Sequence, residues 1–283
     1  MDFVIFDLEW NGAYSKRLNC NINEIIEIGA VKLDSELNKK DEFSILIRPE
    51  LSKKLSSPVM ELTSITNEDL AHGVPFRYAY SKFRKFSTGC VMMTWSTSDI
   101  EALVWNLKYH YGTDRIDFMQ KYADLQQYCH DMLGIEGNNA LGLQSAADML
   151  KIDTNDILKH RALDDSIVSG MCLKKMSSIG SVEPCIVSAD DSFYEKLFFH
   201  PYYITDLSDE NIDHSQLYFD CPECGRRAER KKNWEEKLKS LASLFQCPFC
   251  GYSFKGRVQI KKKYDGITVS KKLIPLQSKK NDK

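Results

Sequence analysis

The run at residues 3–11 constrains the fold most, because it places two acids, Asp7 and Glu9, in an otherwise apolar stretch that predicts a buried strand. Strand side chains alternate between two faces, so both carboxyl groups project side by side from one face. Neighbouring half-buried carboxylates repel each other unless a cation or hydrogen bonds compensate them. Mg²⁺ or Mn²⁺ is the simplest partner, since both prefer carboxylate and water oxygens. The alternative is an edge strand whose acids face solvent.

Strand and helix patterns continue through residues 1–176, which predicts one α/β domain with helices flanking a mixed sheet. After a polar loop at 11–23, apolar runs predict strands at 25–33, 43–48, 90–95 and 115–118. Helices are predicted at 56–65, 125–133, 143–150 and 162–176. Capping boxes predict two further helix starts, at Thr66 with Asp69 and at Ser98 with Glu101. The helically spaced aromatic residues, predicted to lie in the core, are Phe76, Tyr80, Phe83 and Phe86.

Further polar residues could complete a metal site with the first strand. Asp99 follows the strand 90–95 where a helix begins, and ligands of open α/β sheets bind at such strand ends. His160 stands just before Asp164 and Asp165, which open another helix. Acids in a first helical turn can simply compensate the helix dipole, and a single histidine often lies on the surface. An imidazole held near a metal can instead accept a proton from water at neutral pH.

In this order and spacing, these residues resemble the DEDDh superfamily of 3′-to-5′ exonucleases, whose fold is RNase H-like, over about residues 1–176. The chain is most similar to the branch that trims histone mRNA and small RNAs, which includes the bacterial KapD-type sporulation inhibitors. The segments that carry this similarity are 23–29, 47–49, 62–66 and 95–99.

The resemblance implies two catalytic Mg²⁺ or Mn²⁺ ions held by Asp7, Glu9 and Asp165, with Asp99 assisting partly through water. It also implies that His160 deprotonates the attacking water. Asp164 is the alternative last ligand, although the five-residue step from His160 favours Asp165. The residues implied to hold the terminal nucleotide are Trp10, Asn11, Leu62 and Thr63.

Four of the nine cysteines form two matching Cys-Pro-x-Cys-Gly knuckles. The predicted ligands of one structural Zn²⁺ are Cys221, Cys224, Cys247 and Cys250. With 22 residues between the knuckles, they predict a small C-terminal zinc-ribbon β domain at 215–283. Redox dithiols are the alternative. The other cysteines, predicted as small core residues, are Cys20, Cys90, Cys129, Cys172 and Cys185.

Charge is divided unevenly along the chain. Residues 215–283 hold 17 Lys+Arg and 7 Asp+Glu, net +10, whereas residues 1–214 hold 21 and 33, net −12. The basic end therefore predicts a module that grips nucleic-acid phosphates, with a protein-docking ribbon as the alternative. The aromatic segment 177–214 is too apolar for a flexible linker, so we expect a connector that packs on a domain or joins a homodimer.

Together these patterns predict a metal-dependent 3′-to-5′ exonuclease that releases nucleoside 5′-monophosphates, with RNA or short oligonucleotides favoured. Its expected partner is a nucleic acid with a free 3′ end. The alternatives are a non-catalytic nucleic-acid-binding or regulatory adaptor and a DNA proofreading or repair exonuclease. No apolar run approaches the roughly 20 residues that span a bilayer, so we expect a cytoplasmic protein without membrane contact.

Overall fold

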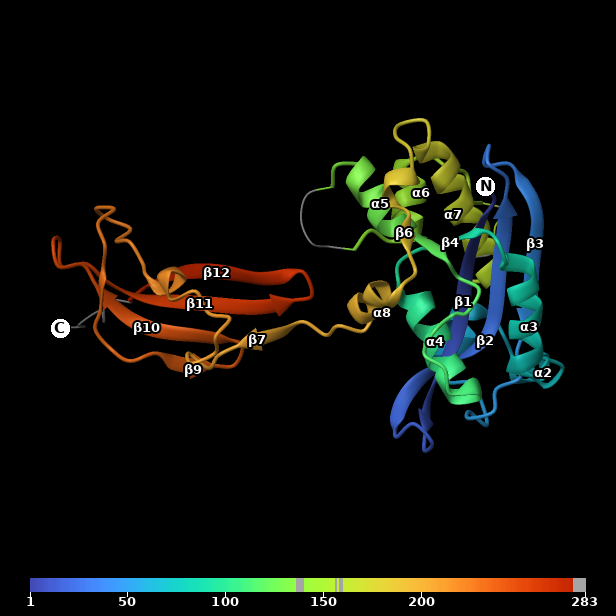
Figure 1. Cartoon of the computed structure of the whole chain (residues 1–283), viewed down its shortest axis with the longest axis horizontal. Coiled ribbons are helices and arrows are strands. Elements are labelled where there is room, and N and C mark those ends of the chain that lie inside the picture. The colour runs from blue at the N-terminus through green and yellow to red at the C-terminus, as the bar shows by residue number, and fades with distance from the viewer. Residues whose placement is uncertain (136–139, 156, 158–159, 277–283) are drawn as a thin grey trace. The chain divides into compact units, whose positions relative to one another are not determined.

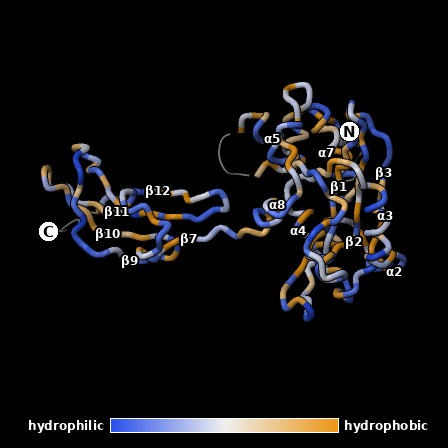
Figure 2. Tube along the Cα trace, in the orientation of Figure 1, coloured by the Kyte–Doolittle hydropathy of each residue, from blue (hydrophilic) through white to orange (hydrophobic). Residues whose placement is uncertain are grey.

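The computed structural model describes residues 1–135, 140–155, 157 and 160–276. The chain divides into two compact units, Met1–Leu197 and Phe198–Lys283 (Figure 1). The segment 177–214, expected as a connector, is shared between the units, with 177–197 in the first and 198–214 in the second. Hydrophobic residues fall in short stretches in both units (Figure 2). In the described part of the chain, no helix has the length and apolarity needed to cross a membrane.

The sheet of the first unit is mixed and is built around the acid-bearing strand. This strand, β1 (Phe3–Ser15), pairs antiparallel with β2 (Cys20–Leu33) and parallel with β4 (Val91–Thr94). The sheet order is β3-β2-β1-β4-β5-β6. The outer strands are β3 (Lys39–Leu46), β5 (Lys121–Asp124) and β6 (Val187–Ser188). A β-bulge follows Glu9, and bulges commonly re-aim side chains beside functional sites.

Helices cover both faces of this sheet (Figure 1). On one face, residues of α5 (Leu125–Met132), α6 (Leu143–Met149) and α7 (Ala162–Met176) share a core with Ile5. On the other face, Phe83 of α3 packs on Phe6 with ring centroids 5.2 Å apart. The remaining helices are α1 (Ser57–Thr63), α2 (Asn67–Ala71), α3 (Phe76–Ser87), α4 (Ser98–Tyr111), α8 (Asp191–Leu197), and the 3-10 turns η1 (Glu183–Cys185) and η2 (His214–Leu217).

Local patterns predicted some details correctly and missed others. The predicted aromatic stripe is largely buried, and the Thr66–Asp69 capping box is present. The Ser98 cap is wrong: Thr97 precedes the first residue of α4 and makes no side-chain capping bond. Ser98 Oγ instead lies 2.6 Å from Ser96 Oγ. A competing side-chain partner therefore replaces the expected cap.

The segment 11–23, predicted as a loop, is instead a hairpin end. Strand β1 continues to Ser15 and β2 starts at Cys20, and these two residues pair directly. The turn between the strands contains Asn19 with φ 53°, a left-handed conformation that asparagine tolerates. Backbone hydrogen bonds hold this end of the hairpin, so its side chains need not be apolar. A polar sequence here therefore looks like a loop.

The fifth strand lies at Lys121–Asp124 rather than at 115–118. Residues 115–118 form a bend and turn, in which the Ile116 N–H donates to the Tyr194 hydroxyl at 3.1 Å. The actual strand has only four residues and begins and ends with a charged residue. Apolar periodicity therefore does not distinguish it.

The second unit has a separate antiparallel sheet and its own core. The order is β12-β11-β10-β8, with β7 on β11 and β9 on β10. Its strands are β7 (Tyr202–Ile204), β8 (Glu229–Arg230), β9 (Glu235–Lys237), β10 (Ser240–Gln246), β11 (Ser253–Lys263) and β12 (Gly266–Pro275). Phe245 and Phe254 stack in this core with ring centroids 5.7 Å apart.

Candidate active site and cysteine centre

Three carboxyl groups from two elements meet above the first strand. Ligand oxygens of Asp7 and Glu9 on β1 and of Asp165 on α7 all lie within 4.8 Å of one another. Asp99, in the first turn of α4, is 2% exposed, and its Oδ1 accepts a hydrogen bond from the Leu8 N–H at 3.0 Å. The structure thus brings together the acids predicted from separate motifs. Asp164 is absent from the group of three.

These acids raise one another's pKa values. Burial, and then the charges of Asp165 and other nearby acids, raise the pKa of Glu9 to about 8. Burial also raises the pKa of Asp165 to about 6, partly offset by His160. The pKa values of Asp7 and Asp99 are likewise raised, mainly by burial. A divalent cation would relieve this repulsion, so the donor set fits Mg²⁺ or Mn²⁺.

The carboxylates line a cavity of about 360 Å³ that also includes most of the predicted nucleotide-binding residues. Residues that line it beside the acids include Trp10, Val59, Leu62, Thr63 and His160. Leu62 is 52% exposed and offers an apolar surface at this cavity. Asn11 does not line it: its side chain is 4% exposed, donates to Ser52 Oγ at 3.0 Å and accepts from the Ser56 N–H at 3.2 Å. Asn11 therefore holds a nearby loop.

His160 lies just before α7, with an exposed side chain and a φ of 59°. Non-glycine residues rarely adopt this left-handed conformation unless the surrounding structure fixes them. The contact that holds the His160 backbone in this conformation is made by the next residue, Arg161. Arg161 Nε and Nη2 donate to the Glu27 carboxylate at 3.1 and 2.7 Å, and the Ala162 N–H donates to it at 3.2 Å.

Glu27 is a positioning residue that the sequence analysis did not identify. It is 1% exposed on β2, directly opposite Glu9, and Arg161 neutralises it at the start of α7. A buried carboxylate needs such a paired, hydrogen-bonded partner. The available signal was the same as for Asp7, namely an acid inside an apolar strand.

Helix α7 is also pressed directly onto β2. A Cβ atom at Gly29 would lie 1.9 Å from the Leu163 backbone nitrogen, so only glycine allows this approach. Ser166 Oγ donates to the Gly29 carbonyl at 3.1 Å. Together with Glu27, these contacts fix the position from which Asp165 reaches β1.

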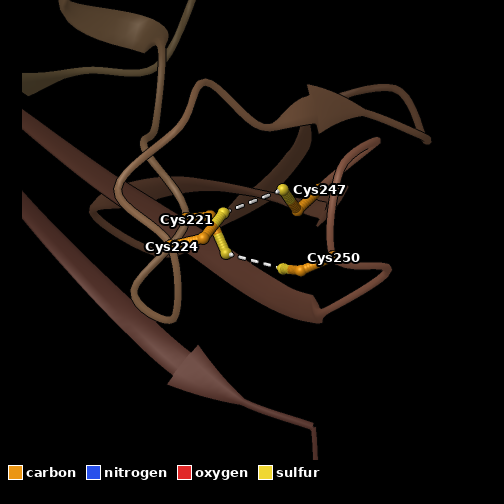
Figure 3. A group of neighbouring side chains, drawn as sticks. All are labelled: Cys221, Cys224, Cys247 and Cys250. Atoms are coloured by element: carbon orange, nitrogen blue, oxygen red, sulfur yellow. Dashed lines mark hydrogen bonds between the residues drawn. The ribbon is translucent and has the colours of Figure 1, made fainter.

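The four knuckle cysteines gather at one point of the second unit (Figure 3). Cys221 Sγ lies 3.5 Å from Cys250 Sγ, and Cys224 Sγ lies 3.5 Å from Cys247 Sγ. A disulfide has an S–S length of about 2.05 Å, so these pairs are unbonded thiols. Four sulfurs at this separation suit tetrahedral Zn²⁺, whose Zn–S bonds are about 2.3 Å.

The backbone of each knuckle supports the same arrangement. Gly225 and Gly251, with φ of 69° and 75°, donate their N–H groups to the carbonyls of Cys221 and Cys247. Backbone N–H groups of Cys250 and Phe249 lower the pKa of the Cys247 thiol to about 6, whereas burial and the neighbouring thiols raise the pKa of Cys250. Cys247 therefore forms a thiolate more readily than Cys250. The residues present therefore fit a structural zinc ion.

We expect Cys247→Ser to unfold the second unit while the first unit keeps its fold, because each unit has its own core. The measurements are zinc content and limited proteolysis, with fragments mapped to each unit. Cys90→Ser, outside the cluster, is the control. Full zinc binding and an intact second unit in Cys247→Ser would contradict a zinc-dependent ribbon.

Comparisons with known proteins fit this arrangement. A family model described as an exonuclease matches residues 4–170. The PolC-type DNA polymerase III of Thermotoga petrophila is 29% identical over 169 residues, covering 59% of this chain and 11% of the polymerase. That of Lactococcus lactis is 33% identical over 91 residues, 32% of this chain and 5% of the polymerase. The chain thus spans 11% or less of these relatives' length.

Solved structures share the fold. The nuclease domain of 3′hExo, a DEDDh family member bound to rAMP, has a TM-score of 0.56 and 20% identity, covering 67% of this chain and 96% of that chain. Cell-death related nuclease 4 (CRN-4) has a TM-score of 0.53 and 19% identity, covering 63% and 64%. These likenesses confirm the predicted α/β, RNase H-like class. Since the exonuclease model matches more than half of the sequence, the chain belongs to the RNase T exonuclease family.

Proposed function

We propose that the protein is a metal-dependent 3′-to-5′ exonuclease that releases nucleoside 5′-monophosphates. The observation that carries this proposal is the meeting of Asp7, Glu9 and Asp165 in one cavity beside His160. Such a cavity, beside the middle of β1, would receive a chain terminus more easily than a continuous duplex. The 3′ direction is further supported by fold likeness to structures described as 3′-exonucleases.

Asp7, Glu9 and Asp165 would hold the two divalent ions, with Asp99 nearby. When bound, the ions would activate the attacking water and neutralise charge on the leaving oxygen. His160 would accept the proton from that water; this proposal is supported by its lining the same cavity as the acids. Trp10 and Leu62 would orient the terminal nucleotide by packing on it.

The remaining residues of the site would hold the proposed catalytic groups in place. Asp99 holds the β1 backbone through the Leu8 N–H, between the two strand acids. Glu27 and Arg161 fix the start of α7. A misplacement of about 1 Å at a reacting centre can lower the rate of catalysis by about 10²-fold, so these contacts matter for turnover.

A paired substitution tests the proposal. With Mg²⁺ or Mn²⁺, the wild type should shorten a 5′-labelled oligonucleotide one nucleotide at a time, and blocking the 3′ end should stop it. Asp165→Asn should remove this activity, whereas Asp164→Asn, its sequence neighbour outside the cluster, should keep it. An inert wild type, or release of the labelled 5′ nucleotide first, would contradict the proposal.

RNA is the favoured substrate, because the similar nuclease domain of 3′hExo was solved with rAMP and a second neighbour is described as recognising a histone mRNA stem-loop. DNA is the second candidate, because the relatives with 29% and 33% identity are DNA polymerases. Matched RNA and DNA oligomers of one sequence would separate the two. Faster shortening of DNA would favour a proofreading or repair role.

A further inference from the structure

Several basic residues of strand β11 lie on one face of the sheet of the second unit. Its residues alternate between the core and the opposite face. Phe254, Val258 and Ile260 lie in the core, and a Cβ atom at Gly256 would lie 2.8 Å from the rings of Phe219 and Phe245. The residues of β11 on the opposite face are Lys255, Arg257, Gln259, Lys261 and Lys263.

Strand register extends this face to two strands that pair with β11, namely β12 and β7. Arg257 pairs with Lys272 on β12, and Lys261 pairs with Thr268 on β12 and with Tyr203 on β7. Directly paired residues point to the same side of a sheet. The side-chain nitrogens of Lys239 and Lys261 lie 5.5 and 5.8 Å from the centre of the Tyr203 ring. We call the surface of Lys255, Arg257, Lys261, Lys263, Lys272 and Tyr203 the basic face.

The positive charge of this face is largely uncompensated. Glu235 projects from the same side, since Ala242 pairs with both Glu235 and Arg257, but it is paired with Lys237 at 3.4 Å. In the described part of the chain, no carboxylate lies within salt-bridge distance of the basic-face lysines at 255, 261 and 272. The face therefore attracts an anion.

We propose that the basic face binds the sugar-phosphate backbone of single-stranded nucleic acid. Alternate side chains along β11 stand about 7 Å apart, which suits a row of phosphates better than a single small anion. The Gln259 side chain, beside the cations on β11, can donate to phosphate oxygens. Tyr203 provides a ring on which a base can stack.

An acidic protein fits this face less well. Stable protein interfaces are centred on packed apolar or aromatic anchors. Here Tyr203 is the one aromatic ring in the defined set, and its flanking residues are lysines. Binding at this face does not require cleavage, so it goes beyond the proposed exonuclease activity and can be measured without it.

The strands supply a matched pair of variants. Lys261→Gln with Lys272→Gln removes two charges from the basic face. Lys262→Gln with Lys271→Gln removes two charges from the adjacent residues of the same strands, which point to the other side. There, the Lys262 Nζ lies 3.4 Å from Asn211 Oδ1, and the Lys271 Nζ donates to the Tyr218 carbonyl at 2.8 Å.

The probe is a fluorescent oligouridylate of roughly 20 nucleotides, longer than the roughly 4–16 nucleotides that one OB-fold domain covers. Full-length chains carrying Asp165→Asn are titrated at several KCl concentrations. We expect the basic-face variant to lose about 10-fold in affinity and its salt slope to fall by about 1.4, since each lost phosphate contact contributes about 0.7. The matched variant should bind like the parent.

Equal losses in the two variants would overturn the proposal, because net charge alone would then explain binding. Unchanged affinity in the basic-face variant would also overturn it and leave an acidic protein as the occupant. Equal melting temperatures and zinc contents verify that both variants are folded; if the basic-face variant is not, Lys255→Gln with Lys263→Gln is the substitute. Because affinity is measured without turnover, the result is independent of whether the chain proves to be an exonuclease.

Discussion

Asp7→Asn is expected to lower turnover by roughly 10³-fold, the loss seen when a charge-stabilising group is removed from a reacting centre. The same change should raise the melting temperature of the metal-free protein at pH 8. The loss of turnover follows from removing one of the three carboxylates that fit the metal ions. The gain in stability follows from burial and the charges of Asp99, Glu9 and Asp165, which raise the pKa of Asp7. The folded protein must hold repelling carboxylates there, and the amide has no charge to repel.

The pH dependence has a definite sign. A carboxyl group whose pKa is raised on folding stabilises the protein most below its unfolded value near 4, and this stability is lost as pH rises through the folded value. With Asp165 at about 6 and Glu9 at about 8, the metal-free wild type should lose stability progressively between pH 4 and pH 8. Added Mg²⁺ or Mn²⁺ should restore it, most strongly at pH 8.

Thermal melts with and without metal, at pH 6 and pH 8, measure these effects. We expect Asp7→Asn to gain on the order of 5 °C over the metal-free wild type at pH 8, since 1 kcal/mol shifts the melting temperature of a domain of this size by about 2–4 °C. Glu36→Gln, on the exposed turn after β2, is the control. A metal-free Asp7→Asn that melts below the wild type at pH 8 would show that the acids do not repel one another.

Features set by neighbouring residues in the chain could be predicted from the sequence, whereas features set by distant contacts could not. Strand alternation placed Asp7 and Glu9 on one face, because the period of a strand needs no knowledge of the rest of the fold. The choice between Asp164 and Asp165 depends on how α7 is rotated over the sheet. That rotation is held by the contact of Arg161 with Glu27, 134 residues earlier, which no local pattern reveals.

The basic end of the chain illustrates the same limit. Its net charge could be counted, but the grouping of Lys261 with Thr268 on β12 and Tyr203 on β7 depends on the register in which β11 pairs with these strands. The hairpin at Ser15 and Cys20 was missed for a related reason, since backbone pairing holds it and side-chain composition does not mark it. Pairing between strands is thus the information that composition lacks.

His160→Ala is the second change with a large expected effect. We expect turnover to fall by about 10²–10⁴-fold, as for the loss of a general base, while the affinity for Mg²⁺ or Mn²⁺ stays the same. The reason is geometric: His160 lines the cavity of the acids, but the close group of oxygens comes from Asp7, Glu9 and Asp165. Single-turnover rates at saturating substrate, together with a metal titration followed by melting temperature, separate the two quantities.

His72→Ala is the matched control, because His72 is an exposed histidine of the same unit that does not line the cavity of the acids. Its ring nitrogen lies 3.0 Å from the Glu68 carbonyl of α2. It should leave both turnover and metal affinity unchanged. Weaker metal binding in His160→Ala would make the histidine a ligand, and full turnover would remove it from the reaction. The left-handed backbone of His160 lies next to the contact between Arg161 and Glu27, so the substitution could also disturb the start of α7. A loss of turnover without loss of metal affinity or stability would exclude such a disturbance and identify the imidazole as the group that takes the proton.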